Sequence, residues 1–143
     1  MNEDSIKLLK ECNSGAKTAI NSFDAVLDKV QDQDLRALLK GSRQAHEDLG
    51  NETDRLLESV GETGKDPSAM ARAGARFKIN LELLAEPTDN TIADLMTDGC
   101  NMGIKQISVY FNKYPNAQDA VKALADRFRS EEDTLLQKLR KYL

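Results

Sequence analysis

The chain has 143 residues, of which 40% are hydrophobic and 31% charged, and its net charge is −4. This length is typical of one domain, so we expect a single helical domain over residues 1–143, with a core that needs no disulfides. The 20 basic residues are dispersed among 24 acidic ones, which disfavours nucleic acid binding. No apolar run is long enough to span a membrane, and residues 1–5 do not resemble the start of a signal peptide. We therefore expect a cytoplasmic protein whose two cysteines, Cys12 and Cys100, are reduced.

Five helices are predicted, because apolar residues recur every three or four positions and nowhere alternate as in a strand. The first helix covers about residues 3–30, and Asn13 is the polar member of its apolar stripe. The second covers about residues 35–60, and the centre of its stripe is polar, with Ser42, His46 and Thr53. A shorter helix is expected over about residues 67–85. Two long helices follow, one that begins near residues 88–90 and ends near 114, and one over about 116–143.

The connections predict how these helices are arranged. Tight turns join the first helix to the second and the fourth to the fifth, which makes each pair antiparallel. The long middle segment allows the chain to return along the bundle before the third long helix starts. Two hairpins joined by one long crossover are the topology of ferritin-like bundles.

Two segments carry a family resemblance. Residues 77–81 (FKINL) and 89–99 (DNTIADLMTDG) resemble an uncharacterised bacterial branch of the ferritin-like four-helix proteins. The resemblance in helix order extends over nearly the whole chain. It implies an all-α, antiparallel four-helix bundle with a short extra helix in the crossover between the second and third long helices. Members of this superfamily include iron-oxidising proteins and proteins without metal, so the fold alone does not specify a function.

The ligand set of a di-iron bundle is absent from the sequence. Such a site needs a Glu from each of two helices and a Glu-x-x-His pair from each of the other two. His46 is the single histidine, and the residue three positions before it is Arg43. Neither Glu131 nor Glu132 has a histidine three positions later. We expect no dinuclear centre and no other cofactor.

His46 is the first residue to consider for a function. It lies on the buried stripe of its helix, and Glu131 or Glu132 is expected at a similar height on the last helix. We favour a structural hydrogen bond between His46 and one of these carboxylates. The alternative is half of a mononuclear metal site or a proton-transfer pair, for which His46, Glu131 and Glu132 are the candidate residues.

Other polar and small residues near the predicted centre have two interpretations each. Asn13, Ser42 and Thr53 are expected to fix the helix register. The alternative is a polar pocket whose members are Asn13, His46, Thr53 and Cys100. Gly99 and Gly103 each destabilise a helix by ~1 kcal/mol relative to Ala, which indicates close approach of another helix or a pocket for a ligand or large side chain. Both cysteines are expected to be small packing residues rather than reactive thiols.

The functional expectation follows from a complete helical stripe with an incomplete ligand set. No nucleophile stands beside a base, and no glycine-rich phosphate loop is present. We expect a non-enzymatic ferritin-like bundle without metal that acts through protein contacts, as a homodimer. The alternative is a small-ligand or mononuclear-metal binding protein that uses the polar centre around His46.

Overall fold

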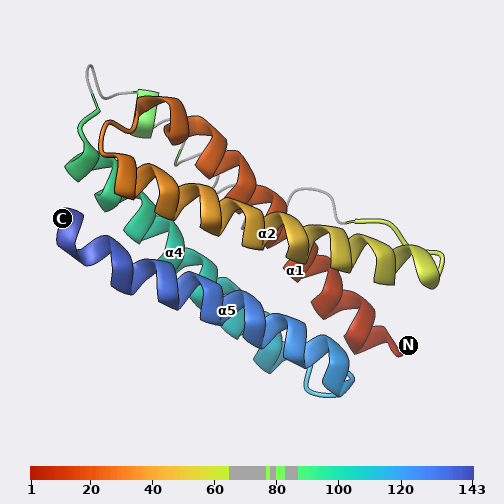
Figure 1. Ribbon diagram of the computed structural model, residues 1–143. Coiled ribbons are helices and arrows are strands. Elements are labelled where there is room, and N and C mark those ends of the chain that lie inside the picture. Colours follow the sequence, from red (N-terminus) through yellow and green to blue (C-terminus); the bar gives the residue numbers. More distant parts are fainter. Residues whose placement is uncertain (65–76, 78–79, 83–86) are drawn as a thin grey trace.

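The computed structural model describes residues 1–64, 77, 80–82 and 87–143, and these residues form helices and no strand. The four long helices are α1 (Glu3–Val26), α2 (Gln33–Ser59), α4 (Asp89–Lys113) and α5 (Asp119–Leu139), shown in Figure 1. Two short 3₁₀ turns, η1 (Leu27–Lys29) and η2 (Arg140–Tyr142), follow α1 and α5. The prediction of an all-α protein is therefore confirmed for this part of the chain. Most of the short helix expected over 67–85 lies outside the described residues, although Phe77 and residues 80–82 are helical.

Local sequence explains where three of these helices begin. The Asn2 side chain accepts a hydrogen bond from the Ser5 amide, and the Asp32 side chain accepts one from the Leu35 amide, each at 2.8 Å. Thr88 begins α4 with a reciprocal capping arrangement that includes Thr91. These side chains satisfy amides that have no partner inside their own helix.

Two predicted boundaries differ from the structure. The first helix was expected to continue to about residue 30, but its α-helical part ends at Val26 and a 3₁₀ turn follows. The last helix begins at Asp119 rather than at 116. The reason for the later start is non-local: the Asn116 amide donates to the Asp4 carboxylate at 3.0 Å, and the Gln118 amide donates to the Ser5 hydroxyl at 2.8 Å. These backbone amides bind the α4–α5 turn to the start of α1 and are therefore not part of a helix.

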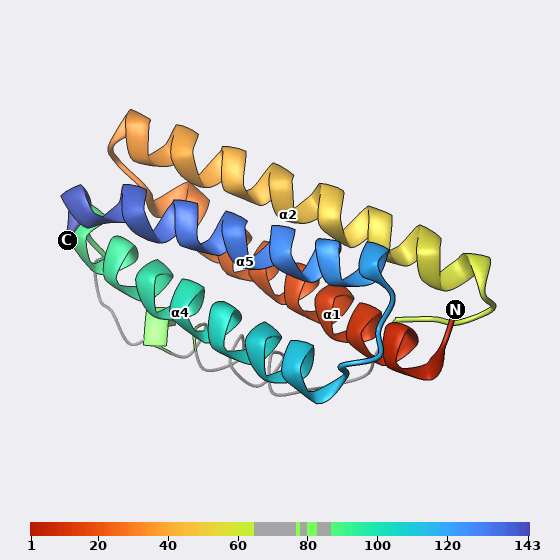
Figure 2. The ribbon, with the colours of Figure 1, turned by 90° about the horizontal axis from the view of Figure 1, so that it is seen from below.

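The helices pair as two hairpins. α1 packs along α2 and α4 packs along α5, while α1 also contacts α4 and α5, and α2 contacts α5. The turn after α2 lies beside α1, since Lys10 binds Glu62 at 2.7 Å. The start of α4 lies at the opposite end, since the Asp89 carboxylate accepts hydrogen bonds from the Gln31 and Asp32 amides. The end of α2 and the start of α4 therefore lie at opposite ends of the molecule (Figure 2).

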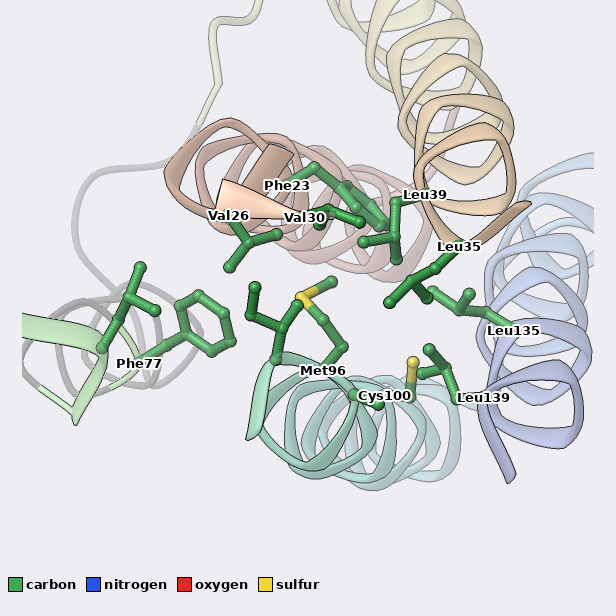
Figure 3. Packing of buried hydrophobic residues seen from close by; sticks show 13 residues of the cluster. Phe23, Val26, Val30, Leu35, Leu39, Phe77, Met96, Cys100, Leu135 and Leu139 are labelled. Carbon is green, nitrogen blue, oxygen red and sulfur yellow. The ribbon is translucent and has the colours of Figure 1, made fainter. Parts of the chain in front are cut away.

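The core has two clusters of buried apolar residues. One lies toward the start of α1 and includes Leu8, Leu9, Ile107 and Phe128. The other lies toward the α1–α2 turn and includes Phe23, Val26, Leu39, Met96 and Leu135. Figure 3 shows this second cluster, in which the Phe77 ring points between α1 and α4 toward Val26 and Met96. No helix in the described ranges is long and apolar enough to cross a membrane.

Candidate functional site

His46 on α2 is completely buried and both of its ring nitrogens have partners. Nδ1 donates to the backbone carbonyl of Ser42, one turn earlier, at 2.7 Å, and Nε2 contacts Oε1 of Glu132 on α5. A carbonyl can only accept, so the Nδ1 proton is fixed on that nitrogen. A second proton must then lie between Nε2 and Oε1, because two acceptors would otherwise face each other. The pair is therefore an imidazolium–carboxylate ion pair or a neutral imidazole bound to a carboxylic acid.

The surroundings favour the ion pair. Burial by itself lowers the pKa of His46, but the hydrogen bond and charge of Glu132, the Ser42 carbonyl and the charge of Glu131 outweigh it and raise this pKa above its ordinary value. The rings of Phe23 and Phe128 cover the imidazole, with centroids 5.3 and 5.5 Å from its own. The proton is thus held between two helices, away from water.

The carboxylate of Glu132 has further neighbours on α4. Burial, followed by the charge and a hydrogen bond of Glu132, raises the pKa of the Cys100 thiol, which therefore stays protonated and donates to the carboxylate. A Cβ atom at Gly103 would lie 3.0 Å from Glu132 Oε2 and 3.4 Å from a ring carbon of Phe128. Gly103 therefore leaves room for two side chains of α5. Glu132 is 5% exposed and connects α2, α4 and α5.

A cavity of about 210 Å³ lies beside this carboxylate, between α1 and α4. Its lining is mostly apolar, and Glu132 and Cys100 are part of it. A Cβ atom at Gly99 would meet nothing within 4 Å, so this position opens into free space, unlike Gly103. The described lining residues are Gly15, Thr18, Ala19, Ser22, Phe23, Phe77, Asn80, Leu95, Met96, Asp98, Gly99, Cys100, Met102, Gly103, Phe128, Glu132 and Leu135.

A second buried polar cluster joins α1 to α2. The Asn13 amide nitrogen donates to Thr53 Oγ1 at 3.0 Å and to Asp54 Oδ1 at 2.8 Å, and the Thr53 hydroxyl donates to the Gly50 carbonyl at 2.8 Å. Asn13 and Thr53 are 1% and 0% exposed. We call these residues the Asn13 cluster, and the group of His46, Glu132 and Cys100 the His46 cluster.

The four residues expected to form one polar pocket thus divide into two places. Asn13 and Thr53 bind each other, while His46 and Cys100 both contact Glu132. Of the four, Cys100 lines the cavity. Glu132, rather than Glu131, is the partner of His46, and the half-buried Glu131 acts on it through charge.

Other ionisable residues behave differently from the His46 cluster. Cys12 is buried, which raises its thiol pKa to about 12. Glu11 is also buried, and the apolar pattern of its helix did not predict this. Within residues 1–64, 77, 80–82 and 87–143, no group of three or more His, Cys, Asp or Glu side chains is arranged to hold a metal ion.

Comparison with known proteins finds a solved structure with a similar fold. No family model and no curated protein matches the sequence. The crystal structure of a DUF305 fragment from Deinococcus radiodurans is similar, with a TM-score of 0.75 over 98% of this chain and 95% of that one. The two sequences are 13% identical, so this similarity shows a shared helical fold and nothing more.

Proposed function

We propose that this protein is a non-enzymatic, ferritin-like four-helix bundle that binds a small molecule in the cavity between α1 and α4. One observation carries the proposal: a mostly apolar cavity of about 210 Å³ has a buried carboxylate, Glu132, in its wall. Ligand sites in proteins are mainly apolar and contain a few well-placed polar groups that fix orientation.

The connectivity supports the ferritin-like part of the proposal. α1 with α2 and α4 with α5 form two hairpins, and the chain passes from one end of the molecule to the other between them. One long crossover between two hairpins is the arrangement of ferritin-like folds.

The chemistry of the interior supports binding over catalysis. Both nitrogens of the single histidine are occupied, by Ser42 and Glu132. Burial raises the pKa values of Cys12 and Cys100, which disfavours the reactive thiolate of each. A mononuclear metal at His46 would have to displace one of two existing contacts, so a small organic ligand fits the site better.

The size of the cavity limits the ligand. An apolar cavity of about 150 Å³ in another protein holds benzene, so this cavity suits a molecule somewhat larger than benzene. Met96 and Met102 are in the wall, and methionine side chains adapt easily to the shape of a ligand. The proposal therefore concerns compounds with one ring or a short branched chain.

The exposed side chains give less support to the alternative that the protein forms a homodimer and acts through protein contacts. Among the described residues, the large hydrophobic side chains that are exposed are four in number, Met1, Val60, Val109 and Leu143. Light scattering coupled to size-exclusion chromatography at high concentration tests the dimer directly, and a strict monomer would remove it.

Thermal melting with a panel of small aromatic compounds tests the proposed function. A ligand of the folded state raises the melting temperature by mass action. Gly99→Leu should fill the cavity mouth and abolish the shift, because its side chain enters free space beside the lining residues. Gly41→Leu is the matched control, since Gly41 is an exposed helical glycine of α2 that also has nothing within 4 Å. The proposal fails if no compound shifts the wild-type protein more than Gly99→Leu.

A further inference from the structure

The charges around the cavity indicate which ligands it accepts, provided that it is the ligand site proposed above. The ionisable groups in its described lining are two carboxylates, Glu132 and Asp98, and the Cys100 thiol. No Lys, Arg or His is among these described lining residues. Glu132 is buried at the inner wall and Asp98 is exposed. The imidazolium of His46 contacts Glu132 and offsets the charge of one carboxylate, so the described lining together with His46 keeps one net negative charge. A ligand with a positive charge is therefore complementary to this lining, and an anion is not.

The apolar part of the wall fits the same class of ligand. The rings of Phe23, Phe77 and Phe128 are all part of the lining. An aromatic ring attracts a cation over its face, more strongly where water is excluded. These rings can accept the hydrocarbon part of a ligand and also stabilise a charged group close to it.

Glu132 has the geometry to hold a cationic group. Its Oε1 is bound to His46, and its Oε2 points toward Gly103, where a Cβ atom would lie 3.0 Å away. A carboxylate can accept about four hydrogen bonds, so contacts with His46 and Cys100 leave capacity for a ligand. His46 also fixes the orientation of the carboxylate, so that no side chain has to be ordered when the ligand arrives.

We infer that the ligand is a small organic amine in its ammonium form, whose charged nitrogen binds Glu132 and whose apolar body lies between the aromatic rings of the cavity. An ammonium group donates up to three hydrogen bonds, to Glu132 and to polar atoms near it. No covalent step is involved. The His46–Glu132 ion pair remains in place and the ammonium adds a second cation to the same carboxylate.

The test compares benzylamine, ethylbenzene and benzoate, which have similar size and differ in charge. Calorimetry and thermal melting at pH 7 should give benzylamine an affinity about tenfold or more above that of ethylbenzene, because a hydrogen bond to a charged group adds that much. Benzoate should bind most weakly. The inference is overturned, with the proposed cavity intact, if ethylbenzene or benzoate binds as tightly as benzylamine. If none of the three binds, both the inference and the proposed function fail.

Variants locate the charge that selects the amine. Glu132→Gln should remove the preference for benzylamine over ethylbenzene, whereas Glu131→Gln, at the half-buried neighbour outside the described lining, should keep it. If Glu132→Gln does not fold, the double variant His46→Gln/Glu132→Gln replaces the ion pair with neutral groups that can hydrogen-bond, and circular dichroism checks its helix content. A preference that persists in a folded Glu132 variant contradicts the assignment.

Discussion

The two buried polar clusters differ in what they join. The Asn13 cluster lies within one hairpin, where the Asn13 amide on α1 binds the buried Thr53 hydroxyl and the half-buried Asp54 carboxylate on α2. The His46 cluster lies between the hairpins, where α2, α4 and α5 meet, and its central group is a carboxylate. The first fixes the register of two helices that a short turn already holds together. The second positions one hairpin against the other, for which the chain provides no short connection.

The clusters also differ in their access to free space. Thr53 is 0% exposed, and neither Asn13 nor Thr53 is among the described lining residues of the cavity. Glu132 and Cys100 are in that lining. A polar group enclosed by its own chain specifies structure, whereas one in the wall of a cavity can also meet a ligand. This contrast suggests that the Asn13 cluster affects stability alone and that the His46 cluster affects stability and binding together.

The largest expected effect is the loss of the carboxylate between the hairpins. Glu132→Ala should lower the free energy of unfolding by about 3–5 kcal/mol at pH 6, because it leaves the buried imidazolium of His46 without its partner. Urea denaturation measures this loss. Glu131→Ala, one residue earlier and half-buried, should change the same quantity by about 0.5 kcal/mol or less. Equal effects of the two substitutions would contradict the role given to Glu132.

A smaller loss is expected for the cluster within the first hairpin. Asn13→Ala leaves buried hydrogen-bonding groups of Thr53 and its surroundings with fewer partners and should cost about 1–3 kcal/mol of unfolding free energy. Asn51→Ala, at an exposed position of α2, is the control. A double-mutant cycle with Thr53→Ala should give a coupling of about 0.5 kcal/mol or more. Additive effects would show that the bond between Asn13 and Thr53 contributes nothing to stability.

Much of the fold could be predicted from local sequence, and the start of α5 shows why one boundary could not. The start of α4 near residues 88–90 was predicted correctly, because Thr88 and Thr91 cap the helix with their own side chains. The sequence pattern predicts a start of α5 that is too early, because residues near 116 bind the first turn of α1, more than a hundred residues away. A helix boundary that depends on capping side chains within one turn can be predicted from the sequence. A helix boundary that depends on contacts with a distant segment cannot.

The site was predictable to a similar degree. The stripe on α2 placed His46 in the core and indicated Glu131 or Glu132 as its partner. The choice between them depends on the rotation of α5, since adjacent residues on a helix point about 100° apart. The contact between Glu132 and Cys100 and the cavity itself depend on how side chains of three helices fill space together. The two glycines within the helix indicated either close approach of another helix or a pocket. In the structure, Gly103 allows the close approach of α5 side chains, and Gly99 lies beside the pocket.

The proton in the His46 cluster makes stability depend on pH. The pKa of His46 is raised in the folded state above the value of 6.5 of an unperturbed histidine. The stabilisation is therefore fully present below pH 6.5 and is lost as the pH rises through the raised folded value, with a slope of at most about 1.4 kcal/mol per pH unit. Urea denaturation between pH 5 and about pH 8 measures this slope, below the range in which the thiols titrate. His46→Gln should remove the dependence, and an unchanged slope in that variant would assign it to another group.

The smallest effects compare two glycines that differ by one helical turn. Alanine stabilises a helix interior by ~1 kcal/mol relative to glycine, so Gly99→Ala should raise the unfolding free energy by up to that amount, since its Cβ meets nothing within 4 Å. Gly103→Ala brings a Cβ to 3.0 Å from Glu132 Oε2, and the carboxylate cannot easily move because His46 holds its other oxygen. Steric conflict should cancel or exceed the helical gain, so Gly103→Ala should be the less stable of the two by thermal and urea unfolding. In a His46→Gln background the carboxylate is freer to move, and the difference between the two alanine variants should shrink. A Gly103→Ala variant as stable as Gly99→Ala in the wild-type background would show that the ion pair does not fix Glu132 in place.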